Sequence, residues 1–400
     1  MSAAVRGIFP SGDPTEELGI EGIRVPVHIR EYWTSRQRAA NRLHEVSYRA
    51  CFKPQLPAYF ISRLTHPRSV VYDPFMGRGT TLVEAALQGR IPWGNDANPL
   101  STLLTRPRLR SPALKDVEER VRSMDLDRRV KVPSELLVFY HPDTLREIVN
   151  LRNRLLRDSR AGRLDAVDDW IRMVAINRLT GHSPGFFSVY TLPPNQATSV
   201  ASQARINERR NQVPPRRSVP DLILRKSRAL LADLSPQDRA RIRSVEADAR
   251  LLTMDASATS SLPSGSVSLV VTSPPFLDIV DYVQDNWLRN WFSGIPRPQL
   301  RLTQARTLPE WERKMTSVFL ELARLLTPDG IIAFEVGEVR NRTIRLEESV
   351  IRCALNAGLA PRGVLVNDQA FTKTSNCWGV SNGERGTNTN RVVVLSRENA

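Results

Sequence analysis

The sequence predicts an α/β protein with a doubly wound, mostly parallel sheet and a mostly helical inserted module. Two segments, near 69–100 and from about 249 onward, alternate buried apolar strands with helical patterns. Such alternation is typical of parallel sheets, because a helix carries the chain from one strand back to the start of the next. Helical patterns dominate the stretch between them. The expected division is an N-terminal extension (1–43), an α/β domain in two pieces (44–104 and 246–400) and a helical insertion (105–245).

The first α/β segment contains one strand–helix–strand unit. The apolar run SVVYDPF, which begins at Ser69, predicts a buried strand that ends at an Asp-Pro pair. The following TTLVEAALQG predicts a helix, with threonines at its start and Gly89 after its end. IPWGNDANP then predicts a second short strand that ends at Asp96. This is the βαβ unit from which parallel sheets are built.

The second α/β segment supplies the rest of the expected sheet. Apolar runs predict strands, and apolar residues at helical spacing predict helices. The expected strands are VSLVVT (267–272), IIAFEVG (331–337) and RVVVLSR (391–397). The expected helices are DYVQDNWLRNWF (281–292), a longer helix from Leu308 that is stopped by Pro328 and Gly330, and SVIRCALNAGL (349–359). Core packing is the expected role of Trp287 and Trp291, which are four residues apart on the first of these helices.

The insertion combines helical patterns with a concentration of positive charge. Its centre, TGHSPGFFSVYTLPPNQATS (180–199), is rich in glycine, proline and aromatic residues and predicts a loop. From Ala201 to Leu230 there are eight basic residues and two acidic ones. A solvated surface is the ordinary explanation of such a run, and contact with phosphates is the alternative that we favour. The candidate phosphate contacts are Arg209, Arg210, Arg216 and Arg217.

The overall composition favours a polyanionic partner and excludes several classes of protein. Lys and Arg number 57 against 42 Asp and Glu, a net charge of +15. The three cysteines have no CxxC spacing, so neither a disulfide framework nor a metal site is expected. No apolar run approaches the roughly 20 residues that a membrane helix needs, and the first residues lack the pattern of a secretory signal. We therefore expect a cytoplasmic protein without membrane contacts.

A glycine turn in the first βαβ unit predicts a nucleoside-containing cofactor. In VYDPFMGRGTTLVEA, Gly77 and Gly79 lie between the strand and the helix, where glycine lets a ligand approach the backbone. Asp96, at the end of the next strand, could accept hydrogen bonds from both ribose hydroxyls. The third glycine of a pyrophosphate-binding turn and a Walker lysine are both missing. Asp73 could face a cationic group, which favours S-adenosylmethionine; an ordinary tight turn is the alternative.

Two motifs together resemble the amino-methylating (cytosine-N4 or adenine-N6) DNA methyltransferases. DPFMGRGTT is similar to the cofactor loop of that family, and TSPPF to its catalytic tetrapeptide with the preceding residue. HEVSYRACFKPQLPAYFI is similar to the segment before the glycine loop. The resemblance implies a Rossmann-like, S-adenosylmethionine-dependent methyltransferase fold. The cofactor-binding residues expected on these grounds are Phe52, Lys53, Asp73, Phe75, Gly77, Gly79, Thr80, Thr81, Asp96 and Asp255, with simple turn chemistry as the alternative for Asp255.

The tetrapeptide fits the chemistry of methylating an exocyclic amine. The nitrogen lone pair is delocalised into the base, so fixed acceptors that pull the nitrogen towards tetrahedral geometry help the reaction. The Ser273 hydroxyl and the Pro274 carbonyl are the expected acceptors, and Pro275 stiffens the turn. Extruding a base from a duplex costs a few kcal/mol, and stacking on Phe276 would return about 1–3 kcal/mol.

The resemblance also bears on the substrate. Serine at the first position of the tetrapeptide favours cytosine N4, although adenine N6 stays open. An RNA base methyltransferase and an inactive DNA-binding protein are further alternatives. Cytosine-C5 methylation is disfavoured, because it needs a nucleophilic cysteine that typically follows a proline, and none of the three cysteines does. The expected partners are double-stranded DNA and, in a restriction–modification system, a cognate restriction endonuclease acting on the same site.

Overall fold

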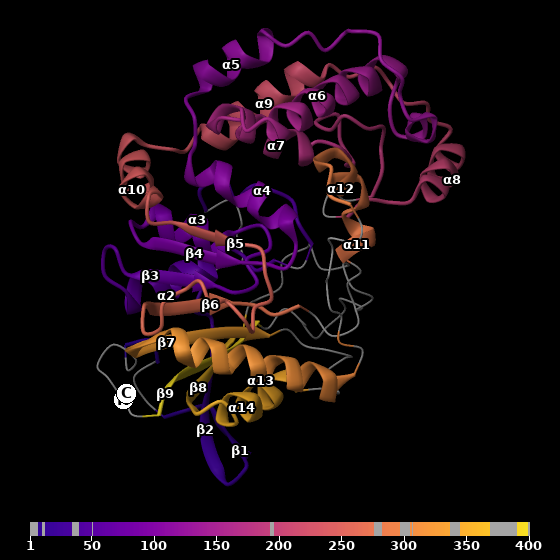
Figure 1. Ribbon diagram of the computed structural model, residues 1–400. Helices are drawn as coiled ribbons and strands as arrows, with labels where there is room; N and C mark the ends of the chain where they lie inside the picture. Colours follow the sequence, from indigo (N-terminus) through magenta and orange to yellow (C-terminus); the bar gives the residue numbers. More distant parts are fainter. Residues whose placement is uncertain are drawn as a thin grey trace.

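A mixed, mostly parallel sheet organises the chain, as Figure 1 shows. The structure is a computed structural model that describes residues 7–9, 13–33, 40–49, 51–192, 196–275, 282–296, 305, 307–336, 345–368 and 390–398. The strands in this part of the chain are β1 (Glu16–Ile20), β2 (Ile23–Arg30), β3 (Val70–Asp73), β4 (Ile91–Asn95), β5 (Arg250–Leu252), β6 (Val267–Thr272), β7 (Leu326–Val336), β8 (Leu359–Asn367) and β9 (Asn390–Arg397). Their order across the sheet is β1-β2-β8-β9-β7-β6-β3-β4-β5.

The pairing confirms the predicted α/β fold class. Strands β4, β3, β6 and β7 are parallel neighbours, and β5 continues this run at the edge. β9 is antiparallel to both β7 and β8, and β2 is parallel to β8. Consecutive residues of β6 face opposite layers: Leu269 and Val271 pack in the layer that contains Phe60, whereas Val270 packs in the layer that contains Phe319. A strand buried on both faces explains the unbroken apolar run.

The helices of the α/β part cover both faces of the sheet. Trp311, Phe319 and Leu322 on one helix pack against the side of the sheet that carries Val270 and Phe334. Phe60 and Ala85 belong to the opposite layer. The helices of this part are η2 (Arg42–His44), α2 (Gln55–Leu64), α3 (Thr80–Leu87), α4 (Pro99–Leu109), α11 (Tyr282–Asp285), α12 (Trp287–Ser293), α13 (Leu308–Leu325) and α14 (Leu346–Leu355).

The helical module lies beyond the β5 edge of the sheet, at the opposite end from β1 (Figure 1). It consists of α5 (Leu114–Arg122), η3 (Ser134–Val138), α6 (Pro142–Arg160), α7 (Ala166–Ile176), α8 (Val200–Arg210), α9 (Val219–Leu231) and α10 (Pro236–Glu246). Trp170 of α7 is fully buried, and its indole nitrogen donates to the hydroxyl of Ser227 on α9. The module shares one hydrophobic cluster with Val83 of α3, Leu104 of α4 and Phe292 of α12.

Several local expectations differ from the structure. The helix that begins at Leu308 does not extend to Pro328: it ends at Leu325, and Leu326 already belongs to β7. Leu326 is fully buried opposite Val267, and a proline at 328 disfavours helical backbone at the residue before it. The expected single helix over 281–292 is two short helices, α11 and α12, because Asn286 departs from helical geometry.

Four strands were not anticipated, and one of them is the short edge strand β5 (Arg250–Leu252). β1 and β2 form a hairpin within the segment expected to be an N-terminal extension, and β2 joins the sheet through β8. β8 itself follows the last predicted helix. Its proline, Pro361, and its glycine, Gly363, obscure the strand pattern, since both residue types are uncommon in strand interiors.

Candidate active site

The glycine turn and the end of β6 lie side by side. Register pairs Val71 of β3 with Leu269 of β6, so the two strands end at the same edge of the sheet. The Thr272 hydroxyl donates to Oδ1 of Asp73 at 2.6 Å. The Thr81 hydroxyl, in the first turn of α3, donates to the Val271 carbonyl at 3.0 Å. The segment that begins at Ser273 therefore starts next to the turn that contains Gly77 and Gly79.

Asp96 holds the glycine turn in shape. Its Oδ2 accepts from the Gly77 amide at 2.8 Å, and its Oδ1 accepts from the Asn98 amide at 2.8 Å. Gly77 has a φ of 48°, in the region that favours glycine. Burial raises the pKa of Asp96, while the backbone hydrogen bonds act in the opposite direction. Asp96 thus shapes the loop in addition to the ribose contact expected of it.

Gly79 has a packing role that the motif alone does not reveal. Its φ is 74°, and it precedes α3 as the N-cap residue. A Cβ atom at this position would collide with the side chain of Thr105 on α4. By contrast, a Cβ at Gly77 would meet nothing closer than Tyr48, at 3.6 Å. Gly79 therefore lets α3 and α4 approach each other, whereas Gly77 serves the turn.

Arg78, between the two glycines, was missed by the sequence interpretation. It is 7% exposed and donates to the carbonyls of Val46 at 2.9 Å and of Phe52 at 3.3 Å. Its Nε donates to the hydroxyl of Thr80 at 3.1 Å. These bonds tie the glycine turn to the segment that contains Phe52 and Lys53. A basic residue inside a glycine turn was the available signal, but its partners lie about thirty positions away in the sequence.

The remaining expected cofactor residues lie around this turn. Phe52 packs against the hydrophobic layer of α2, and burial lowers the pKa of the Lys53 amine. The Phe75 amide donates to Oδ1 of Asp73 at 3.0 Å. Burial raises the pKa of Asp73 to about 7 despite its hydrogen bonds.

Asp255 lies on the loop after β5, where its Oδ1 accepts from the backbone amide and the hydroxyl of Ser257. These contacts show Asp255 in turn chemistry.

The end of β6 lies between polar residues of both neighbouring strands. Thr272 bonds to Asp73 of β3, as described, and the Ser273 hydroxyl lies near Glu335 of β7, where it lowers the pKa of that carboxyl group. Burial raises the pKa of Glu335 to about 7. Two consecutive hydroxyls therefore each lie beside a buried carboxyl group, one on each side of the strand. Glu335 was not identified from the sequence, because it lies inside an apolar strand 62 positions after Ser273.

The two prolines differ in environment. Pro274 is buried, whereas Pro275 is exposed and its carbonyl accepts a hydrogen bond from the indole nitrogen of Trp311 at 3.4 Å. Trp311 thus anchors the turn from α13. Phe276, the fourth residue of the expected tetrapeptide, lies outside the described residues.

The four candidate phosphate-binding arginines fall into two pairs. Arg209 and Arg210 are exposed at the end of α8, where the Arg210 guanidinium lies 3.8 Å from the centre of the Tyr190 ring. Arg216 instead forms ion pairs with Asp143 and Glu147 of α6. Arg217 donates to the Pro184 carbonyl at 3.2 Å. The first pair is presented to solvent, and the second already has protein partners.

The fold and the site define a doubly wound α/β protein with a polar site at the carboxyl ends of its parallel strands. A glycine turn follows β3, an acid follows β4, and a polar segment follows β6, all at the carboxyl edge of a parallel sheet, where such proteins bind ligands.

Comparison with known proteins narrows this class. Residues 23–99 match the N6/N4 methylase family model, which is described as DNA methylase. The type II methyltransferase M.MvaI of Kocuria varians is 34% identical over 103 residues, which are 23% of this chain and 22% of that protein. M.XycI of Xanthomonas campestris pv. cyanopsidis is 36% identical over 77 residues, 19% of this chain and 21% of that protein. M.MjaII of Methanocaldococcus jannaschii is 39% identical over 62 residues, 16% of this chain and 12% of that protein.

These matches bear out the resemblance at the level of the family, over residues 23–99, and make the type II methyltransferases distant relatives. The chain aligns with about a fifth or less of the length of each relative. Among solved structures, the rRNA methyltransferase aviRa of Streptomyces viridochromogenes has a TM-score of 0.34 at 13% identity, covering 92% of this chain and 94% of that one. In the described part of the chain, every helix is too short or too polar to cross a membrane.

Proposed function

We propose that the chain is a site-specific DNA methyltransferase that transfers a methyl group from S-adenosylmethionine to N4 of a flipped cytosine, within a type II restriction–modification system. The single observation that carries the proposal is the contact between the two motifs. The hydrogen bonds from Thr272 to Asp73 and from Thr81 to the Val271 carbonyl bring the polar end of β6 against the glycine turn. A methyl donor bound at the turn would then lie near a base held by Ser273 and Pro274.

The residues around the turn suit S-adenosylmethionine. Two carboxyl groups flank the turn, the buried Asp73 and the half-buried Asp96. Their chemistry fits a ligand with cationic amino and sulfonium groups and with ribose hydroxyls. Gly77 keeps the backbone free of a side chain at the turn. When bound, this cofactor supplies an electrophilic methyl group.

In the proposed reaction, Glu335 orients Ser273. An ionised Glu335 accepts a hydrogen bond from the Ser273 hydroxyl, which leaves the lone pairs of the hydroxyl oxygen free to accept a hydrogen bond from the amino group of the base. The Pro274 carbonyl is the second acceptor, and its direction is stiffened by Pro275, whose own carbonyl is held by Trp311. A carboxyl group with a pKa of about 7 could also accept, through Ser273, the proton that the methylated amine loses. Glu335 is therefore proposed both to position Ser273 and to receive, through Ser273, the proton that the amine loses.

Analysis of the methylated products tests both which base is methylated and whether the substrate is DNA or RNA. The protein is incubated with duplex DNA or with tRNA and with tritiated S-adenosylmethionine, and the digested nucleosides are identified by mass spectrometry. We expect N4-methyldeoxycytidine from DNA. N6-methyladenine would overturn the base assignment, methylated tRNA alone would overturn the DNA assignment, and no transfer to either would favour an inactive DNA-binding protein.

The role of Ser273 is tested by Ser273→Ala. We expect the rate of methyl transfer to fall about 100-fold, because one fixed acceptor is removed from the transition state. The Kd of S-adenosylmethionine, measured by calorimetry, should be unchanged. Ser123→Ala, at the end of α5, is the matched control and should retain full activity. Wild-type turnover in the Ser273 variant would contradict the assignment of that hydroxyl.

A further inference from the structure

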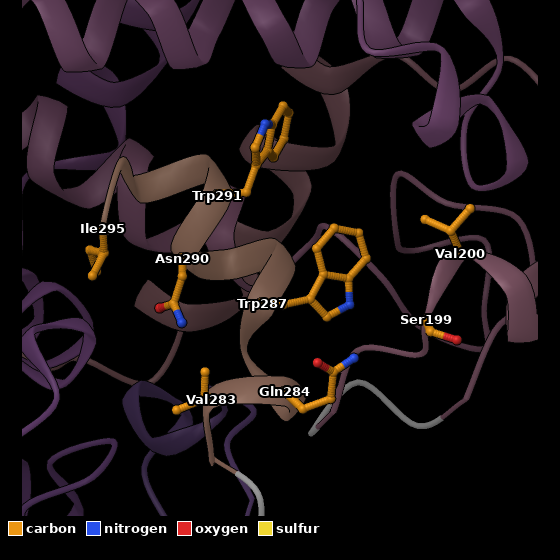
Figure 2. A pocket seen from close by; sticks show the side chains of 8 residues that line it. All are labelled: Ser199, Val200, Val283, Gln284, Trp287, Asn290, Trp291 and Ile295. Atoms are coloured by element: carbon orange, nitrogen blue, oxygen red, sulfur yellow. The ribbon is translucent and has the colours of Figure 1, made fainter. Parts of the chain in front are cut away.

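A pocket on the face of α12 has no role in the site described above. It is a cavity of about 370 Å³ between α11, α12 and the start of α8, and Figure 2 shows Trp287, Gln284 and Ser199 around it. A second hollow, of about 520 Å³, shares Asn290 and Trp291 with the first and continues to α6. The two hollows form one continuous surface, which we call the α12 groove.

The helix α12 is buried on one side and open on the other. Leu288 and Phe292 are at most 1% exposed and pack in the core of the helical module. Trp287 and Trp291 pack only partly against that core and line the groove, so the core-packing role expected of them is incomplete. Partly exposed indole rings are well suited to stacking on nucleobases.

Asn290 lies at the junction of the two hollows with its hydrogen-bonding capacity unused. The residue is 4% exposed, and neither Nδ2 nor Oδ1 has a hydrogen-bond partner among the described residues. A buried amide without partners is costly, so a group that enters the groove and satisfies it gains affinity. The amide offers donors on one atom and an acceptor on the other, which is the pattern that reads the edge of a base.

Positive charge lines the other wall of the groove. Arg152, Arg157 and Arg160 lie along one side of α6 and face the second hollow. The Arg152 guanidinium lies 5.0 Å from the centre of the Trp291 ring, and its Nε donates to the Trp291 carbonyl at 2.9 Å. Asp158, which pairs with Arg157 at 3.2 Å, is shared with Arg163 at 2.7 Å. Charge complementarity therefore favours a polyanion.

The groove is physically connected to the proposed reaction centre. Asp285, in the helix just before α12, forms an ion pair with Arg49. Arg289 of α12 is buried and interacts electrostatically with Tyr48. Tyr48 in turn lies beside Gly77. The α12 groove is thus anchored to the segment that supports the glycine turn.

We propose that the α12 groove binds a second nucleobase of the DNA substrate, separate from the base that is methylated. The base stacks on Trp287 or Trp291, the Asn290 amide reads its edge, and the α6 arginines hold the adjoining phosphates. The groove would therefore determine part of the recognition sequence. This inference rests on the proposed function.

The reading role of Asn290 is tested by sequence selection. Wild-type protein and Asn290→Leu each select bound duplexes from a library of randomised DNA, and the selected pools are sequenced. We expect the variant to lose the preference at one base position while its melting temperature stays equal or rises, because an unsatisfied amide has been removed. A structural role alone would leave the sequence preference unchanged, and that result would overturn the inference.

The stacking and phosphate contacts are tested by affinity. Trp287→Ala should weaken binding of a short duplex about tenfold. Arg157→Gln with Arg160→Gln should reduce the slope of log Kd against log salt by about 2, since each lost phosphate contact removes about 0.9. Arg243→Gln, on the exposed side of α10, is the control for a lost charge and should change the slope little. Unchanged affinity and slope in the groove variants would overturn the inference.

Failure of the proposed function would give different experimental results from failure of the inference about the α12 groove. A wild-type protein that neither binds nor methylates duplex DNA would remove the basis of both proposals. A wild-type protein that binds and methylates DNA, with groove variants that behave as wild type, would contradict only the inference about the α12 groove.

Discussion

Two consecutive hydroxyl groups at the end of β6, those of Thr272 and Ser273, each lie beside a buried carboxyl group. The Thr272 hydroxyl donates to Asp73 on one side, and the Ser273 hydroxyl lies close enough to Glu335 on the other side to lower the pKa of that carboxyl group. Because β6 lies between β3 and β7 in the sheet, the end of this strand is next to a residue of each neighbour. Burial raises the pKa of both carboxyl groups to about 7. Their ionisation therefore changes in the range where the protein is expected to work.

This arrangement predicts a pH-dependent rate. In the proposed reaction, Glu335 accepts a hydrogen bond from Ser273 only when it is ionised, so methyl transfer should rise through about pH 7 and level off above it. Glu335→Gln should flatten the profile between pH 6 and 8, a window that surrounds the pKa of about 7, while leaving cofactor affinity unchanged. The measurement is kcat against pH for both proteins. If the same inflection persists in Glu335→Gln, another group, with Asp73 as the first candidate, is responsible.

The same pKa also has a consequence for stability. The pKa of Glu335 is raised from 4.5 in the folded state, so the unfolded chain releases this proton first as the pH rises. Glu335 therefore reduces the free energy of unfolding progressively between about pH 4.5 and 7, and Glu335→Gln should be the more stable protein at pH 8. Equal stability of the two proteins at pH 5 and pH 8 would contradict this explanation.

At the scale of the element, the packing of α3 on α4 depends on Gly79. A side chain at this position meets Thr105 and also requires a left-handed backbone. Gly89, after the same helix, has a similar φ of 72°, but a Cβ there would meet only Arg241, at 3.9 Å. A substitution at Gly79 therefore costs both backbone strain and a steric collision, whereas a substitution at Gly89 costs backbone strain alone.

We expect Gly79→Ala to destabilise the protein by about 2–4 kcal/mol, because strain at positive φ and overpacking add. Gly89→Ala should cost only about 1 kcal/mol. Denaturant unfolding of both variants gives the comparison. Equal losses of stability would mean that α4 moves aside at no cost.

At the scale of the whole molecule, the helical module and the α/β part share a hydrophobic core. One cluster joins Val83 of α3, Leu104 of α4, Trp170 of α7 and Phe292 of α12. Helix α12 follows the TSPPF segment in sequence but packs among the helices of the module (Figure 1). A shared core couples the folding of the two parts.

The shared core predicts one unfolding transition. Far-UV circular dichroism and tryptophan fluorescence should give coincident denaturation curves, as expected for a cooperative unit. Phe292→Ala should shift both curves together by about 3–5 kcal/mol, because it removes a fully buried ring. Two separated transitions would indicate that residues 105–245 fold as an independent domain.

The parts of the fold that follow from local patterns were predictable. The apolar run of β6, the glycine turn and the helix after it are encoded within a few residues, and the structure has each of them. The boundary between α13 and β7 was not predictable in this way, since Leu326 is drawn into the sheet by its partner Val267. Strands β1, β2, β5 and β8 were missed because their patterns are short or interrupted, and pairing with other strands stabilises them.

The sequence by itself determined the fold class and the two motifs, because both depend on residues that are neighbours in the chain. Only the tertiary structure decided that Ser273 meets Glu335, that Gly79 faces Thr105 and that Arg78 holds the segment before it. It also decided that Trp287 and Trp291 face a groove instead of lying wholly in the core. These contacts join residues that are far apart in the chain. Their geometry therefore depends on the order and register of the strands and on helix packing, and local sequence patterns do not determine these.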